Sequence, residues 1–581
     1  MNIFKPLHDM ICQSVCHVFS IPILDIFSKI TLEPTRNPIH GDLATNGAMV
    51  LAKHLQKTPR EVATLLCDHL QVQNHVAKAE VAGPGFINLT LTPQFWRTHL
   101  VEILTEGRSY GSSTLGQNIP VNVEFVSVNP TGPLHAGHGR NAVFGDAIAA
   151  LLTKVGYAVT REYYINDAGG QVNALADSVY LRYKEALGQS VQPEDFTSDM
   201  YGGHYLVPIG QHLAQLEGVR WLEVDRSHWL PFFRKYAVDA MMKDIQEDLA
   251  LLGIHMDVYT SEEKLVQEGA VDRALQILED EGHVYVGVLT QPKGHTVEDW
   301  EERPQTLFRS TTYGDTLDRA LKKSDGTWTY FAGDIAYHLN KLQRGFTHMV
   351  NILSADHAGY IKRIHAAVRA LTQDTAHIDI KVYQMVNFLD QGQPVRMSKR
   401  AGTFITLRDV IDRVGKDATR FMMISRHADM PIDFDFAKVL EQSRDNPIFY
   451  IQYAHARICS VLRHAQSLFP HMDLEKLKDA NLERLTEDAE FAMIKIISEW
   501  PKQVETAALC REPHRIATYL YDVASEFHAL WNKGKEKTQL RFIHVEDEAE
   551  TCAKLALILA VQNVIASGLL VFGITPTQEM R

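Results

Sequence analysis

Residues 129–141, NPTGPLHAGHGRN, constrain the fold of this chain more than any other segment. The run before them, 121–128, is β-branched and alternating and predicts a strand, whereas 141–156 has helical apolar spacing and ends in glycine. Residues 157–167 predict the next strand. A strand, a glycine-containing loop, a helix and a second strand are typical of the beginning of a doubly wound parallel sheet.

The loop itself carries groups suited to a phosphate. Glycines let backbone N–H groups approach an anion at a helix N-terminus, where the helix dipole is also favourable. His135 and His138 can donate hydrogen bonds to charge that develops on a phosphoryl group, without the fixed charge of a lysine. The alternative is that one histidine caps the helix while the other is solvated.

A second basic loop lies far downstream, at residues 395–407, VRMSKRAGTFITL. It places Arg396, Lys399 and Arg400 close to Gly402. Alone, it is typical of a solvated basic turn. A lysine on a mobile loop could instead close over a polyphosphate and stabilise its charge as the transition state forms.

Composition limits the class of protein. The 581 residues include 71 acidic and 58 basic side chains, a net charge of −13, which argues against a coat of non-specific basic charge but allows a local basic groove. The 6 cysteines contain no C-x-x-C pair, so we expect reduced thiols in the cytoplasm. Residues 555–578 carry no charge, but Gln562 and Asn563 interrupt them, and we expect a buried helix and no membrane attachment.

The chain divides into three expected parts. Residues 1–112 read as an α/β module with a helix cap at Thr58 and two short strands around a turn at residues 83–85. Residues 113–445 read as the parallel-sheet domain, interrupted by an insertion at about 171–302. Strand-like runs return at 327–333, 348–355 and 380–389. Residues 446–581 read as helical throughout, with Asn446 as the first cap.

Together these motifs resemble a known family. HAGH resembles the HIGH signature of class I aminoacyl-tRNA synthetases, and RMSKR resembles their KMSKS loop, with Arg396 in place of the first lysine. The segments VEFVSVNPTGPLHAGHGRN, REYYINDAGGQ, GTWTYFAGDIAYHLNK and NPIFYIQYAHARI are similar to bacterial arginyl-tRNA synthetases, and the likeness runs through nearly the whole chain.

The resemblance implies a fold and an activity. It implies a class I Rossmann-like doubly wound parallel-sheet catalytic domain, an N-terminal α/β module that contacts tRNA, and a C-terminal all-α anticodon-binding bundle. The implied enzyme activates L-arginine with ATP and Mg2+, transfers it to tRNA(Arg), and is a cytoplasmic monomer without a metal site of its own.

It also implies residue roles. The catalytic residues would be His135, His138 and Lys399, and Tyr450, Tyr453 and Arg457 would contact the anticodon. Arginine would be bound by Glu124, Asn129, Tyr330 and Asp334, because a planar guanidinium requires carboxylates and neutral acceptors. ATP would be bound by Pro130, Thr131, Gly132, Pro133, Leu134, Ala136, Gly137, Gly139, Asp356, His357, Gly359, Met397 and Ser398.

Each role has a plainer alternative. Glu124 could be a solubilising edge-strand charge, Asp334 a helix cap and Tyr330 ordinary core. The segment after residue 355 could be a simple turn, and the helix from residue 447 a core helix with a solvated face.

At the level of function, three alternatives remain. They are a synthetase for glutamate, glutamine or cysteine, a small-molecule nucleotidyltransferase, and an inactive tRNA-binding scaffold.

Overall fold

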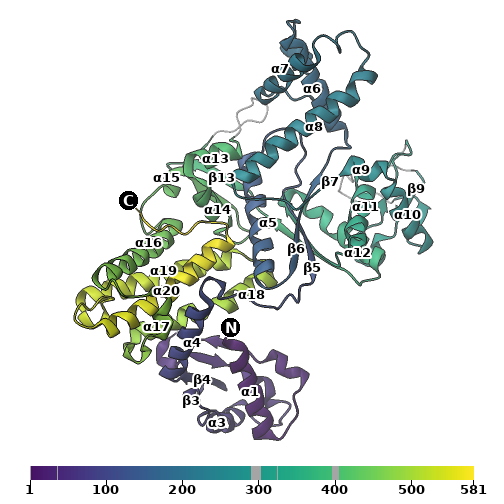
Figure 1. Cartoon of the computed structure of the whole chain (residues 1–581). Helices are drawn as coiled ribbons and strands as arrows, with labels where there is room; N and C mark the ends of the chain where they lie inside the picture. The colour runs from purple at the N-terminus through teal and green to yellow at the C-terminus, as the bar shows by residue number, and fades with distance from the viewer. Residues whose placement is uncertain (1, 36, 290–302, 324, 396–404, 581) are drawn as a thin grey trace.

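The computed structural model describes residues 2–35, 37–289, 303–323, 325–395 and 405–580 (Figure 1). Most of the second basic loop lies outside these residues, including Arg396, Met397, Ser398, Lys399, Arg400 and Gly402. The molecule is extended: the N-terminal module and the C-terminal bundle lie beside each other at one end, and two further bodies project from the central sheet (Figure 1).

The N-terminal module packs helices on a four-stranded antiparallel sheet with the order β1-β2-β4-β3. The predicted cap is confirmed, because the Thr58 side chain and Glu61 form a capping box at the start of α3. The predicted hairpin around residues 83–85 is also confirmed, by β3 and β4. The elements are α1 (Phe4–Phe19), β1 (Leu32–Pro34), β2 (Leu43–Thr45), α2 (Gly47–Ala52), α3 (Pro59–Leu70), β3 (Val76–Ala82), β4 (Phe86–Leu91) and α4 (Pro93–Glu106).

The predicted parallel sheet is present at the centre of the molecule. Its five strands run in the order β12-β11-β5-β6-β7, and every neighbouring pair is parallel. Helices cover it, as a parallel sheet requires. Its elements are β5 (Pro120–Glu124), α5 (Ala136–Lys154), β6 (Ala158–Ile165), β7 (Val258–Ser261), α11 (Tyr330–Gln343), β11 (His348–Ser354), α12 (Ile361–Thr372) and β12 (His377–Tyr383).

The insertion expected at about 171–302 is not one continuous body, because β7 within it joins the central sheet. Before β7, a helical body forms around stacked aromatic rings such as Tyr180 and Trp229. After β7, two helices and a small antiparallel sheet form the second projecting body (Figure 1). These elements are α6 (Gly170–Ala186), α7 (Val207–Glu217), α8 (Arg226–Leu251), α9 (Glu262–Gln267), α10 (Ala270–Asp280), β8 (Val284–Gly287), β9 (Gln305–Phe308) and β10 (Arg319–Ala320).

The strand predicted at 327–333 is wrong. Thr329 is the N-cap of α11, its hydroxyl accepting a hydrogen bond from the Ala332 N–H, so the helix begins at Tyr330. Of the expected pairing, the described residues keep an isolated antiparallel bridge between Lys322 and Trp328, with one backbone hydrogen bond on either side of it.

The last part of the chain forms a small sheet followed by a helical bundle. The bundle begins as predicted, with Asn446 capping α16 and Pro447 in its first turn. The elements are β13 (Val386–Asp390), β14 (Gln393–Pro394), α13 (Leu407–Val414), α14 (Lys416–Ile424), β15 (Ile432–Asp435), α15 (Phe436–Val439), α16 (Pro447–Leu468), α17 (Asp488–Ser498), α18 (Trp500–Cys510), α19 (His514–Glu536) and α20 (Glu548–Val571).

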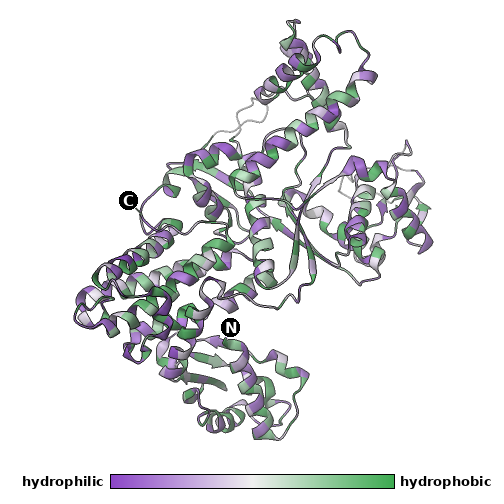
Figure 2. Cartoon of the chain, viewed as in Figure 1, coloured by the Kyte–Doolittle hydropathy of each residue, from purple (hydrophilic) through white to green (hydrophobic). Residues whose placement is uncertain are grey.

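Helix α20 is the one helix in the described part of the chain that is long and apolar enough to cross a membrane. Within its most apolar window, however, 78% of the residues are buried inside the protein. Figure 2 shows this hydrophobic helix packed among the other helices of the bundle. The buried helix predicted over residues 555–578 is therefore confirmed as far as Val571, where α20 ends.

Candidate active site

The carboxyl ends of the parallel strands bring several polar residues to one edge of the central sheet. Glu124 ends β5, Asp167 follows β6, Glu262 follows β7 and Asp356 follows β11. In open α/β sheets this edge is where ligands bind. The edge therefore assembles four acidic residues from four segments of the sequence.

The turn after β5 is strained. Val126 and Ser127 have φ values of 68° and 42°, which a β-branched residue such as valine rarely adopts. The Oδ1 of Asn141, on α5, accepts a hydrogen bond from the Val126 N–H at 2.8 Å, and the Tyr163 hydroxyl donates to the Val128 carbonyl at 2.7 Å. Such strain is characteristic of functional sites, and these bonds hold it in place.

The two histidines lie at the N-terminus of α5. His135 occupies the N-cap position with an extended backbone, and α5 begins at Ala136, earlier than the predicted start at residue 141. The rings of His135 and His138 stack with their centroids 3.4 Å apart. The motif therefore presents both imidazoles at the positive end of a helix, where an anion is favoured.

A segment from the far side of the sequence pairs with this motif. The Ala136 N–H donates to the Ile405 carbonyl at 2.9 Å, and the Leu407 N–H donates to the Leu134 carbonyl at 2.8 Å. An antiparallel bridge joins His135 and Thr406. The residues that directly follow the second basic loop are therefore bonded to the histidine motif, although Lys399 itself lies outside the described residues.

The rest of the glycine loop contacts the helical body that precedes β7. The Tyr205 hydroxyl donates to the Thr131 carbonyl at 2.8 Å, and a Cβ added at Gly132 would meet this hydroxyl at 3.1 Å. Asn129 donates from Nδ2 to Gln171 Oε1 at 2.6 Å. Nothing in the sequence marked Tyr205 as a neighbour of the loop.

Asp334 and Glu262 form the acidic part of the site. Burial, and then the nearby charges of Glu124 and Glu262, raise the pKa of Asp334 to about 7. Burial and the charge of Asp167 also raise the pKa of Glu262. The Oε2 atom of Glu262 is buried and has no hydrogen-bond partner among the described residues. These carboxyl groups are thus suited to a cationic ligand that would satisfy them.

Helix α11 passes Glu262 at Gly333, where an added Cβ would lie 3.5 Å from Glu262 Oε1, an ordinary van der Waals contact. Sequence reasoning did not identify Glu262. It lies in a polar run, SEEK, that resembles an ordinary helix start, and its proximity to Asp334 depends on the pairing of β7 with β6.

Glu124 differs from Asp334 and Glu262 because its carboxylate is already paired with the side chain of a buried lysine. Its Oε2 accepts a hydrogen bond from Lys341 Nζ at 2.6 Å, and Lys341 also donates to Asn351 Oδ1 at 3.1 Å. Strand β5 lies between β11 and β6, so Glu124 is not an edge-strand charge. Its carboxylate contributes to the negative potential at Asp334 while being matched by a buried lysine.

Tyr330 and the segment after β11 are exposed. Tyr330 begins α11 with 56% of its surface accessible, so it is not ordinary core. Asp356, His357 and Gly359 lie in the short 3-10 helix Ala355–Tyr360, directly after β11. They are therefore at the same sheet edge as the histidine motif, whose strand β5 neighbours β11.

A second candidate site lies on the bundle. The Arg457 guanidinium lies 4.3 Å from the ring centroid of Tyr453 and 4.6 Å from that of Trp531, and its Nη1 is 3.1 Å from His528 Nδ1. The ring of Tyr450 lies 4.4 Å from that of His528. This arrangement of aromatic rings and a cation suits the stacking of unpaired bases. Sequence reasoning identified the α16 residues but missed His528 and Trp531 on α19.

Comparison with known proteins gives consistent matches along the chain. Family models for the arginyl tRNA synthetase N terminal domain, the class I (R) tRNA synthetase catalytic domain and the DALR anticodon binding domain match residues 7–91, 99–458 and 451–580.

Individual relatives agree with these models. The chain is 52% identical to an arginine--tRNA ligase of Rhodospirillum rubrum over 100% of both chains, and 52% identical to that of Parvibaculum lavamentivorans over 95% of both. Its fold is similar to that of Thermus thermophilus arginyl-tRNA synthetase, with a TM-score of 0.74, 20% identity and 100% coverage of both chains.

Proposed function

The chain belongs to the arginyl-tRNA synthetase family, and from this premise we propose which of its residues carry the reaction. The enzyme is an arginine--tRNA ligase: it uses ATP to convert L-arginine to arginyl-adenylate and transfers the arginyl group to tRNA. The observation that carries the residue assignment is the pairing of 134–136 with 405–407, because it joins the two motifs that would surround the triphosphate.

In the first step, an oxygen of the arginine α-carboxylate attacks the α-phosphorus of ATP while the bond to pyrophosphate breaks. The nucleophile is already ionised, so positioning and charge stabilisation supply most of the rate. We propose that His135 and His138 donate hydrogen bonds to the α-phosphate region and that Lys399 neutralises the departing pyrophosphate. Residues 130–134, 136, 137 and 139, with Met397 and Ser398, would line the triphosphate.

ATP is the established co-substrate of the family, and we propose that Mg2+ enters with it. Residues 129–139 contain imidazoles, hydroxyl and amide groups but no carboxylate. Since Mg2+ prefers oxygen ligands and is usually held by substrate phosphates, the ion would be carried mainly by ATP. Asp356, His357 and Gly359 would contact the adenosine part, supported by their position at the end of β11.

We propose that Asp334 and Glu262 bind the two sides of the arginine guanidinium. The pKa of each carboxyl group is raised, and one Glu262 oxygen lacks a hydrogen-bond partner among the described residues. A planar cation would offset the cost of burying the two charged carboxylates by donating hydrogen bonds to them. The Tyr330 hydroxyl would assist, and Asn129 would bind the α-amino end. Glu124 would act through its negative potential, since Lys341 already pairs with it.

The tRNA would be held by the two flanking parts. The family match at 451–580 assigns anticodon binding to the bundle, and we propose Tyr450, Tyr453 and Arg457 as base-contacting residues there. We propose functional units of 1–112, 113–445 and 446–581, supported by the nearby limits of the family matches. A cytoplasmic monomer remains our proposal for its state in the cell.

An ATP–pyrophosphate exchange assay with each amino acid, with and without tRNA(Arg), tests this function. We expect exchange with arginine when tRNA is present. Exchange driven by a different amino acid would contradict the assignment of the pocket, and complete absence of exchange would favour a tRNA-binding scaffold. In the same assay, Lys399→Ala tests the loop that lies outside the described residues, and we expect a large loss of rate.

A further inference from the structure

The Tyr205 hydroxyl connects the helical body that precedes β7 to the glycine loop of the active site. Tyr205 lies in a short 3-10 helix, His204–Leu206, that leads into α7. Its hydroxyl donates to the backbone carbonyl of Thr131 at 2.8 Å, although 74 positions separate the two residues in the sequence. The loop that carries the histidine motif is therefore held by a residue of the insertion.

Two glycines make room for the ring of Tyr205. A Cβ added at Gly203 would lie 2.2 Å from Cε1 of this ring, so the ring lies directly against the Gly203 backbone. A Cβ added at Gly132 would lie 3.1 Å from the Tyr205 hydroxyl, which is closer than a normal van der Waals contact. Burial raises the pKa of Tyr205, so its hydroxyl keeps its proton and remains a donor at neutral pH.

The bond from Tyr205 sets the orientation of one peptide group. The peptide between Thr131 and Gly132 is trans and planar, so the Thr131 carbonyl and the Gly132 N–H point in opposite directions. Tyr205 holds the carbonyl toward the helical body, which directs the Gly132 N–H away from that body. Among the described residues, no group accepts a hydrogen bond from this N–H.

The sequence leaves this part of the loop with few donors. Pro130 and Pro133 have no N–H, and the Thr131 N–H already donates to the Asn129 carbonyl at 2.8 Å. Gly132 is thus the one residue of 130–133, all of which the structure describes, whose backbone N–H is available to an anion. Because glycine adopts positive φ values without steric cost, the peptide before it can also flip and present the Thr131 carbonyl instead. The bond from Tyr205 favours the first orientation.

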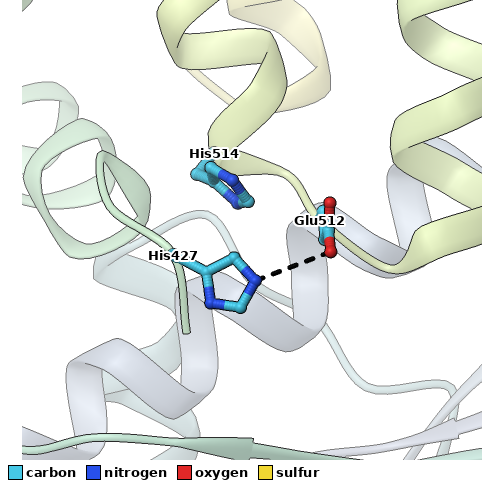
Figure 3. A group of neighbouring side chains, drawn as sticks. All are labelled: His427, Glu512 and His514. Atoms are coloured by element: carbon cyan, nitrogen blue, oxygen red, sulfur yellow. Dashed lines mark ion pairs between the residues drawn. The ribbon is translucent and has the colours of Figure 1, made fainter. Parts of the chain in front are cut away.

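The helix that follows the loop is held by other contacts. The buried Arg140, on α5, donates from Nη2 to the backbone carbonyl of His427 at 3.0 Å. His427 Nε2 in turn lies 3.5 Å from Glu512 Oε1 on the bundle, with the ring of His514 packed beside it (Figure 3). None of these contacts involves Tyr205. Loss of its hydroxyl should therefore leave α5 in place and act on the loop peptide.

We propose that Tyr205 is a positioning residue for ATP: its hydroxyl holds the Thr131–Gly132 peptide so that the Gly132 N–H donates to a phosphate oxygen. This role rests on the proposed position of the triphosphate at the histidine motif. A donor that is fixed in advance stabilises negative charge without reorganisation during the reaction. In the flipped peptide, the Thr131 carbonyl oxygen would face the phosphate and repel it.

Tyr205→Phe removes the hydroxyl and keeps the ring, and the full-length variant is compared with the unchanged protein. In ATP–pyrophosphate exchange with arginine and tRNA(Arg), we expect the KM for ATP to rise about tenfold, as for the loss of one hydrogen bond to a charged group, with a smaller change in kcat. The inhibition constant of adenosine, which has no phosphate, should not change. The KM for arginine should not change either.

Tyr180→Phe is the matched control. The Tyr180 hydroxyl donates to the Trp221 carbonyl at 3.0 Å within the same helical body, so this variant loses the same kind of bond away from the loop. We expect the KM for ATP to stay as in the unchanged protein. Thermal unfolding of both variants checks that each is folded.

An unchanged KM for ATP in folded Tyr205→Phe would overturn the proposal. Equal weakening of adenosine and ATP would also overturn it, because the hydroxyl would then shape the whole nucleotide site. His138→Gln distinguishes this failure from a wrong assignment of the motif. If His138→Gln weakens ATP binding and Tyr205→Phe does not, the motif binds the triphosphate without Tyr205. If neither variant affects ATP, the triphosphate lies elsewhere, and both the proposal and the assignment of the motif fail.

Discussion

Asp334 sits among carboxylates in a partly buried position, and its protonation should control how arginine binds. With a pKa of about 7 in the empty site, the carboxyl group is mostly neutral at pH 6 and mostly ionised at pH 8. A guanidinium binds the ionised form, so the affinity for arginine should fall as the pH is lowered through this window. For one group with this pKa, the loss between pH 8 and pH 6 is about tenfold.

Equilibrium titration with arginine at pH 6, 7 and 8 measures this dependence. In Asp334→Asn the dependence over this window should disappear, and affinity should be lower at every pH, by about 2–5 kcal/mol. An arginine affinity that does not change between pH 6 and pH 8 in the unchanged protein would show that the ionisation of Asp334 does not control binding.

Glu262 and Glu263 provide a matched pair of neighbouring carboxylates. Glu262 has a buried oxygen without a partner among the described residues, whereas the Glu263 side chain is 44% exposed and lies 3.4 Å from Arg234. We expect Glu262→Gln to weaken arginine binding by about 2–5 kcal/mol, seen as the corresponding increase in the KM for arginine, because the guanidinium loses one charged acceptor. Glu263→Gln should leave the KM nearly unchanged, since an exposed ion pair contributes about 0–1 kcal/mol.

Steady-state aminoacylation with arginine as the varied substrate separates the two variants. A similar KM in both would place the guanidinium away from Glu262. The KM for ATP serves as an internal control, and we expect it to change little in either variant.

At the residue scale, the sequence predicts the parts of the site that belong to a motif. His135, His138 and Asp334 can be found because their neighbours along the chain resemble a family signature. Glu262 cannot be found in this way, because a buried partnerless oxygen is a property of packing. The Lys341 partner of Glu124 was missed for the same reason: one lysine of a helix pointing inward has no local signal.

At the scale of elements, α5 is positioned by its contact with the residue after β5. A Cβ added at Gly145 would lie 2.2 Å from Cγ of Phe125, which is fully buried. An alanine at this position would therefore push α5 away from the turn that contains Phe125. Gly145→Ala should therefore destabilise the protein by about 1–3 kcal/mol and displace the histidine motif. We expect a lower unfolding temperature together with a lower kcat.

The control is Gly170→Ala in the first turn of α6, where an added Cβ meets no atom within 4 Å. It should preserve both stability and kcat. If Gly145→Ala also proved neutral, the close contact between α5 and Phe125 would not govern the position of the motif.

The sequence predicts the ends of helices and a hairpin correctly where hydrogen bonds between adjacent residues determine them. The Thr58 capping box, the hairpin at residues 83–85 and the Asn446 cap each depend on a few adjacent residues, and all are confirmed. The run 327–333 was predicted as a strand because threonine and aromatic residues favour strands. The Thr329 hydroxyl instead caps a helix whose buried face packs against α10 and α12.

At the scale of the whole molecule, the sequence predicts three parts and their order. It does not predict that a short segment inside the insertion adds the edge strand β7 to the central sheet. Strand β7 has only the residues Val258–Ser261 and follows a long helical excursion, so nothing local distinguishes it from the insertion around it. Its parallel pairing with β6 brings Glu262 to the site. The carboxylate partner of Asp334 is therefore a consequence of topology.

Arg420 joins the domains in the interior of the molecule. It is fully buried on α14 and donates to the carbonyl of Phe572 at the end of α20, to the carbonyl of Leu252 at 2.9 Å, and to Asp146 on α5 at 2.5 Å. Arg420→Met should keep much of the packing but remove the arginine donor from the two carbonyls and from Oδ2 of Asp146, whose Oδ1 keeps its bond from Arg161 at 3.0 Å. We expect a loss of about 3–5 kcal/mol, as when one partner is removed from a buried ion pair.

The measurement is the midpoint of urea unfolding followed by circular dichroism and by the susceptibility of the bundle to protease. Because Arg420 is bonded to the catalytic domain and to the end of the bundle, its loss should lower the midpoint and expose the bundle to cleavage at lower urea than in the unchanged protein. Arg426→Met, at an exposed arginine just after the same helix, should change neither. If the midpoint fell while the bundle and the catalytic domain still unfolded together, Arg420 would stabilise each domain without coupling them, and the attachment would have to depend on the surrounding apolar contacts.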